Sequence, residues 1–430
     1  MAGMFRGAGV WVAFLVAGLL FAGCEVPADD ARDSRASEST PSAGAVPYDT
    51  ARVSGVGEEA SEPAIGVVDG RVVAAYVVKS GEDGDLFVRS FDTAKRAFSE
   101  PVRVNPVPGQ VKTWYGDPPT IAAGPEGKIY VAWTAKYPDG ERGTILYMSG
   151  SRDGGASFDE PVRVNDDAEP ASHGMHSMAV APDGKIYFAW LDERYLKGKT
   201  AATPTPHGGH GNSNVNAGPH PEEAEVEPNA ELYFAQSNDG KTFSGNRRLA
   251  GEVCPCCKTA TVISEKGRVA IGYRKVFDGE FRHIAVTSLN DFGDAWSQPV
   301  QVSDDGWRIN ACPVSGPALR FDGDTLEIAW YSGGEAGPHG IYTSRSTDGL
   351  RTFAPRRLVG ETGGGGSPVW AGERLFWSTE GNMRGADADS AVSSFGSGKN
   401  LVAATADGRA YRAFVVAEGD RKAVWLGWDK

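Results

Sequence analysis

An apolar pattern that recurs seven times is the feature of this 430-residue chain that most limits its fold. In each copy a Gly or Asp turn precedes a strongly apolar strand with an aromatic residue, and another short apolar strand comes just before. Repeats of about 50–60 residues that cannot bury a core alone must pack on one another, and without helical periodicity they indicate a β-propeller. The copies lie at 70–78, 127–136, 184–194, 267–276, 324–333, 373–381 and 422–430.

A second motif, centred on aspartate, follows most of these strands. It consists of Ser or Thr, any residue and Asp, with an aromatic residue a few positions later. The hydroxyl and the carboxylate can hydrogen-bond turn amides while the aromatic ring packs between neighbouring sheets. The motif resembles the Asp-box, or BNR repeat, of the sialidase superfamily. Its best copies, SRDGGASF, SNDGKTF, NDFGDAW and STDGLRTF, contain Asp153, Asp239, Asp291 and Asp348.

The resemblance implies an all-β, sialidase-type propeller over residues 51–430, in a single domain. We expect six blades, the superfamily's familiar number, with seven as the alternative. The last strand pair follows TADGRAY (405–411) so closely that we expect it to augment the sixth blade. ARVSG (51–55) resembles an outer strand and is expected to close the ring on the C-terminal blade. A Pro-, Gly- and Asn-rich insertion at about 196–230 is expected to be a disordered loop.

The N-terminus predicts export. Arg6 is followed by an uncharged apolar run that ends in Phe21-Ala22-Gly23-Cys24, which is typical of a signal peptide over 1–23. The small residues before Cys24 resemble a bacterial lipobox, which implies a lipidated Cys24 and an acyl anchor in a lipid bilayer of the cell envelope. The alternative is an ordinary signal peptide. Residues 24–50 are too polar to fold and are predicted to be a flexible tether.

Charge and cysteine number limit the classes of partner. A net charge of −13 without a basic stretch argues against nucleic acid. If Cys24 is lipidated, four of the five cysteines remain. Because this number is even and the compartment is oxidising, the four cysteines could form disulfides.

The residues for sialidase catalysis are incomplete. The resemblance implies three arginines that bind the substrate carboxylate and a Tyr–Glu nucleophile pair, and the first arginine belongs to an Arg-Ile-Pro motif. Pro63-Ala64-Ile65 aligns with that motif, but Ser61 stands where the arginine is expected. Serine cannot make the bidentate, charge-assisted contact that a carboxylate needs. Enzyme activity therefore stays possible, but the sequence favours a non-catalytic protein.

Propellers place the start of each innermost strand at one mouth of the central channel. When the repeats are aligned, two neighbouring units place cysteines there, and the unit before them places two histidines and a methionine. These predicted metal ligands are Cys254, Cys256, Cys257, Cys312, His173, Met175 and His176. Further residues expected at the mouth are Glu62, Tyr115, Asp117 and Trp307.

Cys, His and Met together favour copper, with zinc behind it. Two other interpretations stay open: a disulfide between Cys312 and the 254–257 segment, and reactive or redox thiols. The preferred function is a membrane-anchored, non-catalytic binding protein with a copper site. Its partner is a metal ion, a glycan or a protein of the cell envelope. The alternative is a glycoside hydrolase of the exo-α-sialidase type.

Overall fold

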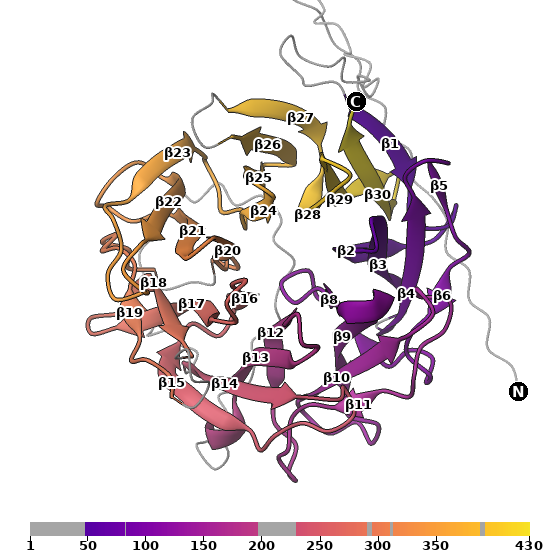
Figure 1. Ribbon diagram of the computed structural model, residues 1–430, viewed down its shortest axis with the longest axis horizontal. Coiled ribbons are helices and arrows are strands. Elements are labelled where there is room, and N and C mark those ends of the chain that lie inside the picture. Colours follow the sequence, from indigo (N-terminus) through magenta and orange to yellow (C-terminus); the bar gives the residue numbers. More distant parts are fainter. Residues whose placement is uncertain (1–47, 82, 197–228, 290–294, 310–312, 388–391) are drawn as a thin grey trace, which may run out of the picture. The chain divides into compact units, whose positions relative to one another are not determined.

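Antiparallel strands account for nearly all of the computed structural model (Figure 1), which describes residues 48–81, 83–196, 229–289, 295–309, 313–387 and 392–430. These residues belong to one compact unit. Their only helical elements are two 3-10 turns, η1 (Pro125–Gly127) and η2 (Arg194–Leu196). No helix in these ranges has both the length and the apolar character that a membrane crossing needs. The all-β prediction is confirmed for this part of the chain.

Within the described residues the strands form five antiparallel sheets, which divide into seven groups of four strand positions; three of these groups are separate sheets. The first separate sheet consists of β20 (Ala318–Asp322), β21 (Thr325–Ser332), β22 (Gly340–Ser346) and β23 (Arg357–Glu361). The second consists of β24 (Val369–Ala371), β25 (Arg374–Thr379), β26 (Asn382–Ala386) and β27 (Ser393–Ser397). The third consists of β28 (Lys399–Ala406), β29 (Arg409–Glu418), β30 (Arg421–Asp429) and β1 (Tyr48–Arg52).

The other four groups are joined in pairs. The first group consists of β2 (Ala60–Val68), β3 (Arg71–Ser80), β4 (Asp83–Asp92) and an outer position shared by β5 (Ala97–Phe98) and β6 (Val102–Arg103). Strand β7 (Val111–Lys112) links it to the second group, which consists of β8 (Thr120–Ala123), β9 (Ile129–Lys136), β10 (Thr144–Ser151) and β11 (Val162–Arg163).

The third group consists of β12 (His173–Val180), β13 (Ile186–Asp192), β14 (Ala230–Ser237) and β15 (Arg247–Val253). The fourth consists of β16 (Ala260–Ile263), β17 (Val269–Phe277), β18 (Phe281–Ser288) and β19 (Val300–Gln301). A single residue pair between β15 and β17, Val253 with Lys275, joins these two groups.

The first strands of the groups lie next to one another. Strand β2 contacts β8, and the contacts continue in order through β12, β16, β20, β24 and β28, which contacts β2 again. Figure 1 shows these strands facing a common centre, with the later strands of each group farther out.

The last repeat differs from its prediction. Strands β28 to β30 do not augment the preceding sheet; they form a separate sheet that β1 completes. Tyr48 lies opposite Asp429, and Arg52 lies opposite Trp425. The predicted pairing of the N-terminal segment with the C-terminal repeat is confirmed, although this strand begins at Tyr48 rather than at Ala51.

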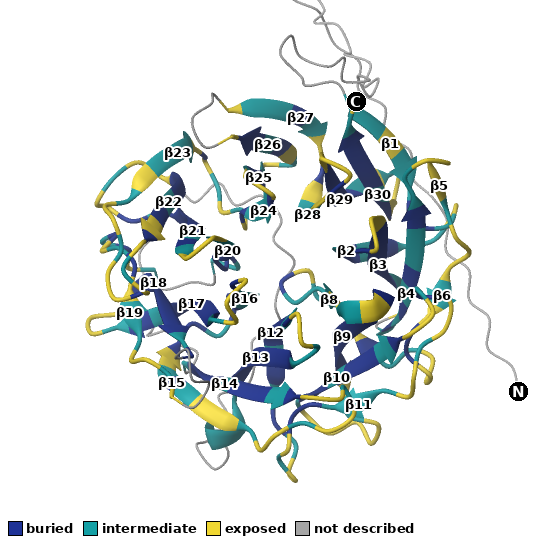
Figure 2. Ribbon diagram, in the orientation of Figure 1, coloured by how far each residue is buried: buried dark blue, intermediate teal, exposed yellow. Residues whose placement is uncertain are grey.

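The core lies between neighbouring groups. The aromatic residue of the repeated pattern is fully buried on the second strand, as in Trp133, Trp190, Trp330 and Trp377. Figure 2 shows burial falling from the second and third strands toward the outer ones. One apolar cluster combines Trp133 of β9 with residues of β3 and β4, so each interface fills with side chains from two repeats. Burial of a large apolar side chain stabilises the fold by about 1.5–3 kcal/mol.

A bulge recurs near the start of three first strands. Glu62 in β2, Met175 in β12 and Asn400 in β28 have positive φ angles of 56°, 53° and 51°. The register of each strand shifts at that residue. Because a bulge turns the local side chains away from the regular pleat, it changes the direction in which these strand starts present their residues.

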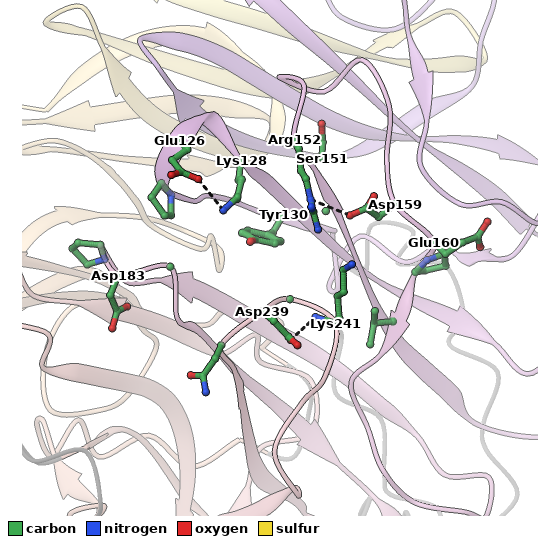
Figure 3. Close-up of a pocket in the computed structure, with 18 residues that line it drawn as sticks. Glu126, Lys128, Tyr130, Ser151, Arg152, Asp159, Glu160, Asp183, Asp239 and Lys241 are labelled. Atoms are coloured by element: carbon green, nitrogen blue, oxygen red, sulfur yellow. Dashed lines mark hydrogen bonds and ion pairs between the residues drawn. The ribbon is translucent and has the colours of Figure 1, made fainter.

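A pocket of about 780 Å³ lies between the second and third groups (Figure 3). It is lined by the turns that precede β9 and β13 and by the turns that follow β10 and β14. Those turns adjoin the ends of β8 and β12, opposite the strand starts where the metal site is predicted.

Candidate functional site

The three cysteines of the 254–257 turn lie together and are buried, with exposures of 0–4%. The Sγ atom of Cys254 is 3.7 Å from those of Cys256 and Cys257. All three sulfurs lie within 4.8 Å of one another. None of the three forms a disulfide. Cys312 lies outside the described residues, as does Cys24.

Backbone hydrogen bonds hold this cysteine turn between two repeats. The amide of Cys254 donates to the carbonyl of Arg274 at 2.9 Å, which fixes one end of the turn to β17. The amide of Thr259 donates to the carbonyl of Met175 at 3.0 Å, which fixes the other end to β12. Met175 and the cysteines share one apolar core cluster. The turn is therefore a fixed part of the fold.

Two buried arginines lie beside the sulfurs. Arg282 donates from Nη1 to Cys254 Sγ at 3.0 Å. Arg274 donates to the carbonyls of Ser315 and Tyr331, each at 3.0 Å. Its guanidinium stacks on Trp307 at 4.6 Å, so this predicted mouth residue packs against the arginine. Their charges offset negative charge on the cysteines.

The thiols differ in acidity. Hydrogen bonds from Cys256 and Cys257, together with the charge of Arg282, hold the pKa of Cys254 well below its usual value. Burial raises the pKa of Cys257 to about 12. Cys254 is thus the more acidic of these two thiols, and Cys257 is the less acidic.

The spacing of the sulfurs matches metal ligation. Two thiolates that bind one tetrahedral ion at about 2.3 Å lie about 3.8 Å apart. The two measured separations from Cys254 are both 3.7 Å. An ion can therefore be placed among these sulfurs with little movement of the backbone.

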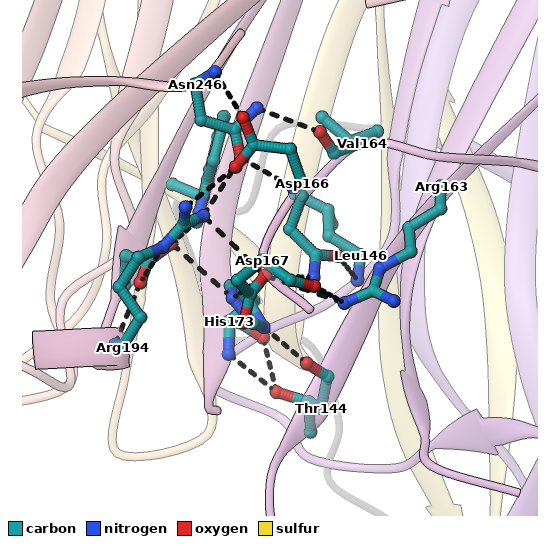
Figure 4. Close-up of polar contacts among 12 residues, drawn as sticks. Thr144, Leu146, Arg163, Val164, Asp166, Asp167, His173, Arg194 and Asn246 are labelled. Atoms are coloured by element: carbon teal, nitrogen blue, oxygen red, sulfur yellow. Dashed lines mark hydrogen bonds and ion pairs between the residues drawn. The ribbon is translucent and has the colours of Figure 1, made fainter. Parts of the chain in front are cut away.

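His173, predicted as a metal ligand, is not among the residues that group with the cysteine sulfurs in the described part of the chain; Figure 4 shows it in a polar network with Thr144 and Asp167. Its Nδ1 is 2.5 Å from the carbonyl oxygen of Thr144. Its Nε2 is 3.1 Å from Asp167 and 3.5 Å from Asp192. Asp192 also accepts hydrogen bonds from Arg194 at 2.9 Å. Nδ1 is thus engaged by Thr144, and Nε2 lies within ion-pair distance of two carboxylates without a hydrogen bond of good geometry to either.

His176 is likewise not among the described residues whose ligand atoms group with the three cysteine sulfurs. Its Nδ1 is 3.3 Å from Asp117, and its Nε2 is 3.4 Å from the carbonyl of Ala132. Asp117 accepts from the hydroxyl of Thr134 at 2.6 Å and pairs with Lys258 at 3.3 Å. Lys258, the residue after Cys257, was missed because a single lysine after a cysteine motif looks like a solvated charge.

Glu62 adds a second buried carboxyl to this polar cluster. Its side chain is 3% exposed, and Oε2 has no hydrogen-bond partner in the described part of the chain. Burial raises the pKa of Glu62 to about 8. Burial opposes the ionisation of Asp117, but Lys258 and His176 outweigh it and lower the pKa of Asp117. The two carboxyls therefore differ in protonation state at neutral pH.

Tyr115 lies beside this cluster and is 47% exposed, and its ring is 5.8 Å from that of Trp114. Trp307 differs from Tyr115 in its exposure, because only 5% of Trp307 is exposed. The predicted mouth residues thus contribute to two environments, one around Asp117 and one around Arg274.

The Asp motifs form hydrogen-bonded turns. Asp153 accepts from the amide of Ser157 at 2.9 Å, and this bond, together with one from the Ser157 hydroxyl, lowers the pKa of Asp153 to about 2. Asp239 accepts from the amides of Lys241 and Thr242 at 2.8 Å, and Asp348 makes equivalent bonds. Asp291 lies outside the described residues.

The fold resembles that of a solved polysaccharide lyase, although no family model and no curated protein matches the chain. Polysaccharide lyase Uly1 aligns with a TM-score of 0.51 and 10% identity, over 85% of this chain and 89% of that chain. The Hadza microbial sialidase Hz136 aligns with a TM-score of 0.48 and 13% identity, over 86% and 66%. An α-L-arabinanase from Penicillium chrysogenum aligns with a TM-score of 0.48 and 12% identity, over 89% and 97%. The alignment with the lyase shows a shared fold alone.

Proposed function

We propose that this chain is an exported metal-binding protein, built on a seven-bladed β-propeller, that holds a soft ion through Cys254, Cys256 and Cys257. Cu(I) is the preferred ion, ahead of Zn²⁺. The main observation that supports this proposal is that three buried sulfurs lie close together, at a spacing that suits one ion.

The strand pairing supports seven blades. If each four-stranded group is taken as one blade, there are seven, and the cycle of contacts from β2 through β28 back to β2 supports a closed ring. The seventh blade takes its outer strand, β1, from the N-terminal side and its other strands from the C-terminal repeat. A ring closed in this way holds the cysteine turn against β12 and β17.

Charge supports a monovalent soft ion. Three thiolates around Cu(I) carry a net charge of −2, which two buried cations at Arg282 and Arg274 can offset. Thiolate sulfur selects Cu(I) or Zn²⁺ over oxygen-preferring metals. Met175 packs in the same apolar cluster and is our candidate for a further soft ligand. Because an apolar environment excludes water, exchange of the ion should be slow.

The test is a titration of the purified full chain, without a polyhistidine tag and under anaerobic conditions. We expect one equivalent of Cu(I) to bind in competition with a Cu(I) chelator. Cys254→Ser and Cys257→Ser should each abolish this binding. Cys24→Ser is the matched control and should bind like the parent chain. Thiols that all remain titratable in the presence of Cu(I), or binding that survives both site substitutions, would contradict the metal site. Tighter binding of Zn²⁺ than of Cu(I) would contradict the assignment to copper.

Anchoring rests on the lipobox-like sequence before Cys24. A lipidated Cys24 would place the protein in the bacterial cell envelope, held in a bilayer by its acyl chains. Cells that express the chain should incorporate labelled fatty acid into it, and Cys24→Ser should remove the label. An unlabelled parent chain would instead support a cleaved, unanchored form.

A second candidate function is action on a sugar at the polar cluster of Glu62, Asp117 and Lys258. A buried carboxyl that holds its proton beside one that is ionised is the pairing that an acid and a base catalyst require. Ser61 opposes the exo-α-sialidase form of this function. Turnover of a fluorogenic sialoside that disappears in Glu62→Gln would favour this candidate over a purely binding role, whereas no turnover by the parent chain would remove the sialidase form.

A further inference from the structure

The pocket between the second and third groups lies on the opposite end of the first strands from the cysteine turn. Its volume of about 780 Å³ falls within the range of small-molecule binding sites. Figure 3 shows its labelled side chains converging from turns of both groups around Tyr130. Its walls come from four turns that the strands hold in place, so the space is part of the fold.

The aromatic residue in this pocket is fixed in position. Tyr130 of β9 is 8% exposed and packs in a core cluster with Ile186. Three glycines lie against its ring: a Cβ added at Gly124, Gly150 or Gly240 would lie 2.9, 3.3 or 3.0 Å from a ring atom. At Gly240 the φ angle of +70° also disfavours any other residue. The backbone therefore clamps the ring.

Both donors and acceptors line the pocket. Lys128 pairs with Glu126 at 3.2 Å, and Arg152 is 3.6 Å from Asp159. These pairs are exposed, at 81% for Glu126, so they stabilise the fold little and can be exchanged for ligand contacts. Lys241 lines the pocket as well, and its ammonium has no ion-pair partner within the described residues.

We propose that this pocket binds a neutral oligosaccharide. Sugar hydroxyls both donate and accept, so they match a wall that contains lysine and arginine donors as well as carboxylate acceptors. The Tyr130 side chain, only 8% exposed, is a fixed part of the pocket wall. A preordered pocket also lowers the entropy cost of binding. This inference is independent of the metal site.

The charges exclude two other ligand classes. Five carboxylates and three cations line the pocket, which gives a net charge of −2 and disfavours anionic glycans and phosphates. A multivalent cation would need converging oxygen ligands, and the described carboxylates form no group of three with ligand atoms within 4.8 Å. The mixture of charges therefore favours an uncharged, hydroxyl-rich ligand.

The test begins with the purified full chain on an array of oligosaccharides, followed by calorimetry with the neutral trisaccharides maltotriose, cellotriose and chitotriose. A trisaccharide of galacturonic acid is the anionic comparison. We expect saturable binding of at least one neutral sugar, weakened about tenfold or more by Lys241→Ala and by Arg152→Ala. Arg351→Ala, which removes a cation from another Asp-motif turn outside the pocket, should leave the affinity unchanged.

Chemical labelling gives a measurement that does not depend on the folding of a variant. The bound sugar should protect Lys128 and Lys241 from amine-reactive reagent, while Lys266, an exposed lysine elsewhere, reacts as before. Absence of binding by every neutral sugar at millimolar concentration, binding of the anionic sugar only, or affinity and labelling that stay the same in all arms would each overturn the proposal. Loss of Cu(I) binding in the cysteine variants should not change the sugar affinity.

Discussion

The cysteine turn and the His173 network lie in neighbouring repeats, but they use metal-binding residue types in opposite ways. In the turn, three sulfurs face one another at distances that an ion can span. In the network, Nδ1 of His173 is engaged by Thr144, and Nε2 lies within ion-pair distance of two carboxylates. A ligand atom that already has protein partners must lose them before it can bind a metal. The state of the ligand atoms therefore distinguishes a metal site from a structural network better than the residue types do.

The largest effect on stability is expected from a substitution in the His173 network. Asp192 is fully buried and accepts from Trp190, at 2.8 Å, and from Arg194. Asp192→Ala leaves a buried tryptophan donor and a guanidinium without their partner, so it should lower the free energy of unfolding by about 3–5 kcal/mol. Urea denaturation measures this loss. Asp159→Ala, which removes an exposed pair, should change stability by less than about 1 kcal/mol. Equal effects of the two substitutions would mean that the His173 network is not structural.

The next largest effect tests whether the cysteine turn binds an ion. An ion that binds only the native state, at a free concentration about 100–1,000 times its Kd, stabilises the fold by about 2.7–4.1 kcal/mol. Cys257→Ala should remove this increase and change the metal-free protein much less. Thermal melts with and without Cu(I) measure both. A variant that Cu(I) still stabilises fully would show that the ion binds elsewhere.

The pH dependence of stability gives a smaller contrast. Glu62 has a pKa of about 8 in the native state, against about 4.3 in an unfolded chain, and Asp117, Lys258 and Lys422 surround it. The native state therefore binds more protons between these values, so stability falls as pH rises from about 4.3 to about 8. Glu62→Gln removes this penalty and should be more stable than the parent at pH 8.5, by about 2 kcal/mol once water penetration is allowed for.

Denaturation at pH 5 and at pH 8.5 checks this sign. Glu126→Gln is the matched control, because it makes the same change at a side chain that is 81% exposed. A difference between Glu62→Gln and the parent that stays constant between the two pH values would contradict the buried, protonated carboxyl.

The smallest expected effect concerns the Asp turns. Asp153 is exposed and bonds to Ser151 and Ser157. Asp153→Ala should reduce stability by about 1 kcal/mol, because water can replace part of what these hydrogen bonds provide. The comparison with Asp192 then ranks a solvent-accessible turn below a buried network. A loss as large as that of Asp192→Ala would reverse this ranking and would make the turn a main support of the repeat.

The sequence predicted the repeated strands because apolar alternation and turn residues are local signals. The segments at 127–136 and 184–194 contain β9 and β13 almost as drawn from the pattern. The expectation that the last strand pair augments the preceding sheet was wrong for a non-local reason. The sheet of β28, β29 and β30 takes its fourth strand, β1, from the other end of the described chain, and spacing within the C-terminal repeat does not show that strand.

The site was predicted in part. The clustering of Cys254, Cys256 and Cys257 follows from their closeness in the chain and their place before an inner strand. The loss of His173 as a ligand depends on Asp167 and Asp192, whose approach only the folded sheets bring about. Lys258 gains its role from Asp117, a partner far away in sequence.

The pairing of β1 with β30 has a consequence for chain connectivity. Tyr48 and Asp429 are register partners, so their Cα atoms lie about 5 Å apart, although nearly the whole described chain separates them. A linker of a few residues could join these positions, and a cut in the turn between two of the four-stranded groups would then create new termini. Such a circular permutant would keep every strand neighbour but would change which group is completed only when the last strand has been synthesised. Its folding rate, rather than its stability, would report how much the present order of the groups matters.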